Sequence, residues 1–147
     1  MATSTTPPPG PTGPAAAEGG AARAHRVLAQ LFLALAVIQF FLAGLGTFKF
    51  EDSDSSAFDI HRAVGDLLGL IALILIVLAV IGRKQAQQAS IVLFVLMIVQ
   101  NILAGFGEDA PVVGALHPVN GLLILGVAML VIAGRPVQFG VPHGSQA

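Results

Sequence analysis

Two histidines at repeated positions are the residues whose types and spacing could do chemistry. His61 follows the phrase Q-F-F-L-A-G-L-G, and His117 follows the phrase Q-N-I-L-A-G-F-G. Each histidine has a glycine four residues later, so the pattern Q-x-x-L-A-G-x-G, loop, H-x-x-x-G occurs twice. Such self-similarity indicates a duplicated helical hairpin with one histidine in each repeat. Polar groups at membrane depth are costly and are by default candidates for function, so the pair predicts a shared ligand.

Small and amide side chains accompany the two histidines. Gly65 and Gly121 continue the two histidine faces at i+4. Aligned small residues predict a slot for a flat ligand, although Gly65 and Gly69 also form a small-xxx-small pattern typical of plain helix packing. Gln39 and Gln100 lie at equivalent depths, and either they form hydrogen bonds across the bundle or they line the ligand pocket.

The remaining polar residues leave alternatives open. Arg62 could pair with a carboxylate, either Asp59 or a ligand's propionate. Asp66 is the only acid within a predicted segment, and a divalent-metal site made of Asp66 and the two histidines is a weaker alternative, because diagonal helices should hold the rings too far apart for one small ion. Another alternative keeps both histidines as interfacial residues satisfied by water or a loop carbonyl. His25 and His143 fall in or beside the tails and are not expected to contribute.

The elements that must position these residues are four apolar segments. The 147 residues are 55% hydrophobic and only 10% charged, a composition typical of a single membrane domain. Each segment has about the ~20 residues that cross a bilayer as a helix, and only helices satisfy their own backbone groups in lipid. The predicted spans are 27–48, 60–81, 89–106 and 116–133.

The predicted fold class is therefore an all-α integral membrane protein, a four-helix bundle made of two repeated hairpins. The transmembrane domain covers residues 23–135. Residues 1–22 are rich in Pro, Gly and Ala and predict a disordered tail, and residues 136–147 predict a second, short tail.

The distribution of basic residues predicts the orientation. Five of the seven lie before the first segment, between the second and third, or after the fourth: Arg23, Arg26, Arg83, Lys84 and Arg135. The positive-inside rule then places both termini in the cytoplasm and both histidines near the outer face.

Net charge and cysteine content exclude several functions. A formal net charge of −1 gives no electrostatic case for nucleic acid, and the lack of cysteine excludes disulfides, zinc–thiolate sites and thiol catalysis. Richness in Ala, Gly, Arg and Pro favours a bacterial source and hence a plasma membrane.

The repeat also predicts a distance. Two hairpins related by an axis along the membrane normal place the second and fourth helices diagonally, about 12–14 Å apart in a square bundle. Two imidazoles on one iron require a backbone separation of about 12–13 Å. The pair His61 and His117 is therefore predicted to be able to hold one iron between two imidazoles.

Three stretches resemble one family. V-I-Q-F-F-L-A-G-L-G, F-D-I-H-R-A-V-G and V-Q-N-I-L-A-G-F-G…A-L-H-P-V-N-G, within about residues 25–135, resemble one four-helix half of heme A synthase, the membrane enzyme of cytochrome oxidase assembly. The resemblance implies that His61 and His117 are the axial ligands of a single heme. Phe58 stands where that family has a Glu, the outer-loop cysteines of many members are missing, and only one half is present. The resemblance therefore implies the fold and the ligands, and not the oxidation of a heme methyl group.

The predicted function is a heme-binding membrane protein with a bis-histidine, b-type heme, acting in electron transfer or heme handling. Its partners would be the lipid bilayer, the heme, and a membrane redox partner or a second copy of the chain. The alternatives are a cofactor-free structural or transport-associated subunit and, less favoured, a homodimeric heme-modifying enzyme. The sequence leaves enzymatic activity open and favours its absence.

Overall fold

Helices form almost all of the structure. The computed structural model describes residues 19–48, 56–107 and 109–138. These residues contain four stretches long and apolar enough to cross a membrane, which confirms the predicted all-α bundle. The elements are α1 Gly20–Thr47, α2 Ser56–Gly82, the 3-10 turn η1 Lys84–Ala86, α3 Gln87–Gly105, the one-turn helix α4 Pro111–Gly114 and α5 Leu116–Ala133.

Helix α1 begins earlier than the sequence predicts. The expectation of disorder over residues 1–22 is wrong for the last three, which form the first turn of α1. Packing explains the extension, since a Cβ on Gly82 would lie only 2.8 Å from the Cβ of Ala21, so the glycine lets the end of α2 touch the start of α1. Residues 1–18 and 139–147, most of both predicted tails, lie outside the described residues. The predicted second tail is described over residues 136–138, where the Val137 carbonyl accepts a 3.3 Å hydrogen bond from Gln88 Nε2 of α3.

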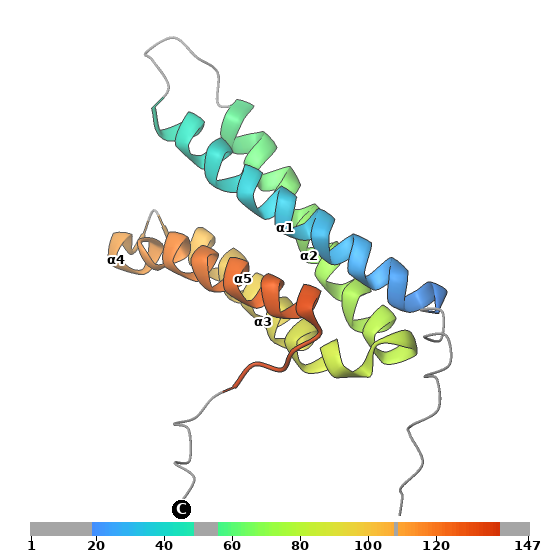
Figure 1. Ribbon diagram of the computed structural model, residues 1–147. Coiled ribbons are helices and arrows are strands. Elements are labelled where there is room, and N and C mark those ends of the chain that lie inside the picture. The colour runs from blue at the N-terminus through green and yellow to red at the C-terminus, as the bar shows by residue number, and fades with distance from the viewer. Residues whose placement is uncertain (1–18, 49–55, 108, 139–147) are drawn as a thin grey trace, which may run out of the picture.

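The four long helices form a square in which each packs against two neighbours. Both α1 and α3 pack against α2 and α5, and in the described part of the chain no backbone contact joins α2 to α5 or α1 to α3. The two helices that carry the histidines are therefore the diagonal pair, as the repeat predicts. The α1–α2 hairpin and the α3–α5 hairpin lie close at one end and diverge toward the other (Figure 1).

The core lies in the half of the bundle where the hairpins converge. Each long helix contributes one large, fully buried side chain to it, and alanines surround these side chains. Small residues let backbones approach, as expected where helix association in lipid depends on close packing. The four large residues are Phe32, Leu75, Leu93 and Val131, and the alanines are Ala29, Ala36, Ala72, Ala89 and Ala128.

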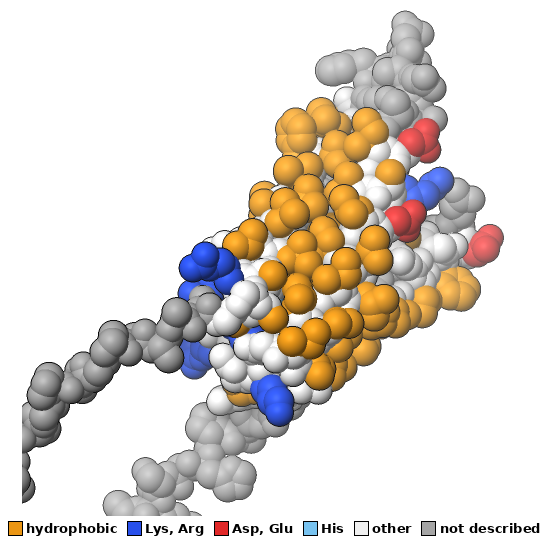
Figure 2. Space-filling view, turned by 90° about the vertical axis from the view of Figure 1, so that its right-hand side faces the viewer, with side chains coloured by type: hydrophobic (Ala, Val, Ile, Leu, Met, Phe, Trp, Pro, Cys, Tyr) orange, Lys and Arg blue, Asp and Glu red, His pale blue; other side chains and the backbone are white. Residues whose placement is uncertain are grey.

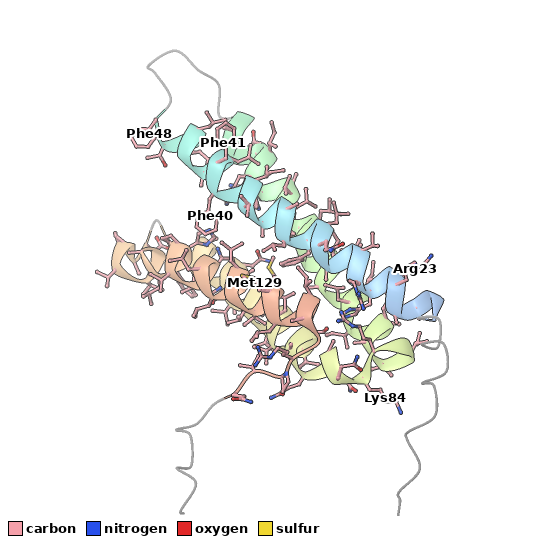
Figure 3. All side chains as sticks on the ribbon, viewed as in Figure 1. Arg23, Phe40, Phe41, Phe48, Lys84 and Met129 are labelled. Atoms are coloured by element: carbon pink, nitrogen blue, oxygen red, sulfur yellow. The ribbon has the colours of Figure 1, made fainter. Side chains whose placement is uncertain are left out.

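The outer surface is apolar between two charged ends. Large apolar side chains from all four long helices are exposed. Figure 2 shows them as a band between Lys and Arg side chains at one end and, at the other, Asp and Glu side chains with basic atoms among them. Arg23 and Lys84 mark the basic end, opposite Phe48 (Figure 3). A large exposed apolar surface marks contact with another apolar phase, so the chain is a multi-pass membrane protein whose helices contact the lipid bilayer.

Candidate functional site

The structure brings His61 and His117 together. His61 lies in the second turn of α2 and His117 in the first turn of α5. Their ring centroids are 6.1 Å apart, and the ring planes are inclined by 52°. Two imidazoles on opposite sides of one metal ion have centroids about 6 Å apart, because each metal–nitrogen bond is about 2 Å long. The rings therefore have the separation that one shared metal ion requires.

A backbone carbonyl of the neighbouring helix holds each ring in the same way. His61 Nδ1 lies 3.1 Å from the carbonyl oxygen of Gln39, and His117 Nδ1 lies 3.2 Å from that of Gln100. A carbonyl oxygen can only accept, so each Nδ1 carries the proton and each Nε2 keeps a lone pair. Metal-binding histidines are oriented in this manner, with the second ring nitrogen donating to a carbonyl or carboxylate. The repeated glutamine thus marks the residue whose backbone orients the histidine.

The side-chain amides of the two glutamines have different partners. Gln39 Nε2 donates to the backbone carbonyl of His61 at 2.8 Å, and its buried Oε1 has no hydrogen-bond partner among the described residues. Gln100 Nε2 lies 3.1 Å from His117 Nε2, while its Oε1 accepts a 2.7 Å hydrogen bond from Asn120 Nδ2. Both amides therefore bond within their own hairpin and not across the bundle, and the two repeats are not equivalent.

The two repeated glycines make room for neighbouring side chains. A Cβ on Gly65 would lie 3.2 Å from Gln39 Nε2, and a Cβ on Gly121 would lie 3.0 Å from the ring of Phe40. Figure 3 shows Phe40 in the space between the two hairpins. The slot predicted from the small residues is thus filled beside Gly121 by an aromatic ring, whereas a Cβ on Gly69 would meet nothing within 4 Å.

The structure does not supply a third metal ligand. Arg62 and Asp66 are exposed, and no group of three His, Cys, Asp or Glu residues in the described ranges could hold a metal ion. The alternative in which Asp66 completes a divalent-metal site is therefore wrong. The distance argument against a single ion is wrong as well, because the side chains of His61 and His117 reach across the diagonal to a 6.1 Å centroid separation.

A second polar cluster, which the sequence analysis missed, joins the helices at the basic end. Arg83, between α2 and η1, is only 5% exposed. Its Nη1 and Nη2 donate to the carbonyls of Val131 and Ile132 in α5, at 3.1 and 2.8 Å. Nη1 also lies 3.3 Å from His25 Nδ1, and His25 Nε2 lies 3.2 Å from Ser90 Oγ. This cluster ties α1, α3 and α5 to the end of α2.

The expectation that His25 lies in or beside a tail is wrong, because it lies in α1 and its side chain is completely buried. The signal that could have found it is spacing, since the buried residues of α1 recur every three or four positions, as one helix face requires. These residues are Ala22, His25, Ala29, Phe32 and Ala36. The partners of His25 lie 58 and 65 residues away, and no spacing along the chain reveals such distant neighbours. His143 lies outside the described residues.

One family model of unknown function matches part of the chain. Residues 39–107 match a family described as "Family of unknown function (DUF6220)". The matched part is less than half of the chain. It includes both repeated glutamines and His61 and ends before His117. No curated protein matches the chain, and no solved structure does so either.

Proposed function

We propose that this membrane protein holds one b-type heme between α2 and α5, with His61 and His117 as axial ligands, and serves electron transfer or heme handling. One observation carries the proposal: the two ring centroids are 6.1 Å apart, and both Nδ1 atoms are engaged by backbone carbonyls. The Nε2 atoms of His61 and His117, which carry the lone pairs, are therefore the atoms that can bind the iron.

The number of protein ligands favours heme over a bare ion. Zinc sites use at least three protein ligands, and the described residues offer no group of three. In a heme the macrocycle supplies four nitrogens to the iron, so two histidines complete the coordination. The resemblance of the repeats to one half of heme A synthase supports the same ligand pair.

The chain's own residues would orient and tune the group. A hydrogen bond from Nδ1 to a backbone carbonyl fixes the ring and raises the basicity of Nε2, which strengthens it as a ligand. Gly69 leaves open space on α2, and Phe40 supplies an aromatic surface between the hairpins. A bis-histidine heme supplies one-electron transfer at its iron.

The proposal extends to orientation and setting. The basic end faces the cytoplasm, so both termini are cytoplasmic and the histidines lie near the outer face, because basic residues are retained on the cytoplasmic side. The membrane is the plasma membrane of a bacterium. A membrane redox partner, or a second copy of this chain, would exchange electrons or heme with the site.

The test is the absorption spectrum of the full chain, purified in mild detergent from heme-replete cells. We expect a Soret band and, after reduction, a sharp α band, both lost or altered in His61→Ala and in His117→Ala. His143→Ala is the matched control and should leave the spectrum unchanged. A colourless protein would contradict the proposal and favour a cofactor-free structural or transport-associated subunit. Conversion of one heme into another on co-expression would instead identify a heme-modifying enzyme.

A further inference from the structure

The two repeats differ at the third residue after the histidine. In the second repeat this residue is Asn120, which is buried and donates from Nδ2 to the carbonyl of Leu96 at 2.9 Å and to Gln100 Oε1 at 2.7 Å. In the first repeat it is Val64, which has no polar group. The second repeat therefore has a hydrogen bond on its glutamine that the first repeat cannot form.

Asn120 fixes which end of the Gln100 amide faces the histidine. Because the Leu96 carbonyl can only accept, the Asn120 end at that contact is the NH2 group, and Gln100 presents its oxygen to the same group. The Gln100 NH2 group is thereby directed to His117 Nε2, 3.1 Å away. Both nitrogens of the His117 ring are then occupied, Nδ1 by the Gln100 carbonyl and Nε2 by the Gln100 amide.

His61 is not held in this way. The NH2 group of Gln39 donates to the backbone carbonyl of His61, 2.8 Å away, and not to the His61 ring. His61 Nδ1 donates to the Gln39 carbonyl. Nε2 of His61 has no hydrogen-bond partner among the residues that the structure describes.

We propose that Asn120 and Gln100 keep His117 capped, so that the two histidines are unequal ligands: His61 is open to a metal, and His117 becomes available only when the Gln100 amide leaves its Nε2. Asn120 is a positioning residue in this scheme, since it acts on the ligand only through Gln100. The inference rests on the proposed heme site and adds an order of engagement to it.

The experiment is titration of the purified, heme-free full chain with hemin in detergent, for wild type and variants. Because His117 is capped, His61→Ala should weaken hemin binding at least about tenfold more than His117→Ala does. Asn120→Val, which gives the second repeat the residue of the first, should raise affinity about three- to tenfold, the factor that one hydrogen bond of ordinary net strength represents. In the His61→Ala background the same substitution should partly restore binding. Asn101→Val, at an exposed position one residue beyond Gln100, is the control and should change nothing.

A second pair of variants leaves Asn120 unchanged and compares removal of the glutamine amide in the two repeats. Gln100→Leu removes the amide but keeps the backbone carbonyl that orients His117, so hemin affinity should again rise. Gln39→Leu makes the same change in the first repeat, where the amide does not touch the ring, and should give no gain. Far-UV circular dichroism identifies any variant that has lost its helices. If Asn120→Val or Gln100→Leu does not fold, the other variant and its control decide whether His117 is capped.

The outcomes separate the two proposals. If wild type binds hemin with both histidines, but the two alanine variants weaken binding equally and neither Asn120→Val nor Gln100→Leu raises affinity, the capping of His117 is refuted and the heme site stands. If helical wild type and variants all fail to bind hemin, the heme site is refuted and the order of engagement falls with it.

Discussion

At the scale of the residue, each of the two histidines forms the same hydrogen bond from Nδ1 to a backbone carbonyl, but the glutamine amides beside them have different partners. The shared bond uses the backbone carbonyls of Gln39 and Gln100, so it survives any change of the glutamine side chain. The Gln39 amide donates to the backbone carbonyl of His61, whereas the Gln100 amide contacts the ring nitrogen Nε2 of His117. Two repeats that share the glutamine and histidine positions but differ at Val64 and Asn120 therefore have one open imidazole and one covered imidazole.

The contact between Phe40 and Gly121 gives a prediction at the same scale. Gly121→Ala places a Cβ 3.0 Å from the Phe40 ring, which must give way by a few tenths of an ångström. We expect the free energy of unfolding to be about 1 kcal/mol lower than for Gly69→Ala, because this crowding offsets the helix preference of alanine. Unfolding of the heme-free protein in mixed detergent measures this change. Gly69→Ala is the control, because its Cβ meets nothing within 4 Å and alanine favours the helix. Equal stability of the two variants would contradict the close contact.

At the scale of the element, Arg83 supports the end of α5. The last carbonyls of a helix lack partners within the helix, and a cation near them is favourable. Arg83 donates to two such carbonyls, those of Val131 and Ile132, and contacts His25 from α1. One guanidinium group thereby fixes the relative positions of helix ends that are far apart in sequence.

Removal of this guanidinium should destabilise the bundle. We expect Arg83→Gln to lower the free energy of unfolding by about 2–4 kcal/mol, because hydrogen bonds to charged groups contribute about 1.5–3 kcal/mol each. Lys84→Gln makes the same change of charge at the next, exposed residue and should have an effect within about 0.5 kcal/mol, as is usual at a surface position. Thermal unfolding in detergent compares the two. Similar melting temperatures for both variants would show that the buried contacts of Arg83 do not matter.

Gly134 ends α5 in a conformation that favours glycine. Its φ is +67°, and a Cβ there would lie 2.9 Å from Nη2 of Arg83. Gly134→Ala should therefore cost at least about 1 kcal/mol, the penalty for a left-handed residue with a side chain. Gly126→Ala, within the same helix and with open space around its Cβ, should not destabilise the protein. The measurement is the melting temperature, and an unchanged value for Gly134→Ala would contradict the strained geometry.

The elements differ in how far the sequence predicts them. The four long helices could be predicted because long apolar runs in lipid have no other way to satisfy their backbone. The extension of α1 to Gly20 could not, because it depends on Gly82 receiving the Ala21 contact. That His61 and His117 face each other from diagonal helices could be predicted from the repeat, but their 6.1 Å centroid separation could not, because it depends on how far the side chains reach across the diagonal. The cap that Asn120 and Gln100 place on His117 likewise depends on side-chain directions.

At the scale of the whole molecule, the charged ends and the apolar band define an axis (Figure 2). The hairpins converge at the basic end, where Arg83 and His25 hold them, and diverge toward the end that carries the histidines (Figure 1). The convergence of the hairpins at one end and their divergence at the other could not be predicted from the sequence. In the sequence, His25 looks like part of a tail, and its contact with Arg83 is not visible. The arrangement leaves the core in one half and the candidate site in the other.

The absence of cysteine from the sequence makes the orientation directly testable. Val112→Cys lies at the histidine end and Gln85→Cys at the basic end, and both positions are exposed. We expect a membrane-impermeant maleimide to label Val112→Cys in intact cells and to label Gln85→Cys only after the membrane is opened, because basic residues remain in the cytoplasm. The reverse labelling pattern would place the histidines on the cytoplasmic side and contradict the proposed orientation.

Whether His61 and His117 bind one iron is decided by the electron paramagnetic resonance spectrum of the oxidised protein after addition of one equivalent of hemin. If His61 and His117 are both ligands of one iron, the spectrum shows a low-spin ferric signal in wild type and a high-spin signal in His117→Ala. A low-spin signal that survives both single histidine substitutions, or no protein-bound ferric signal at all, would contradict the account.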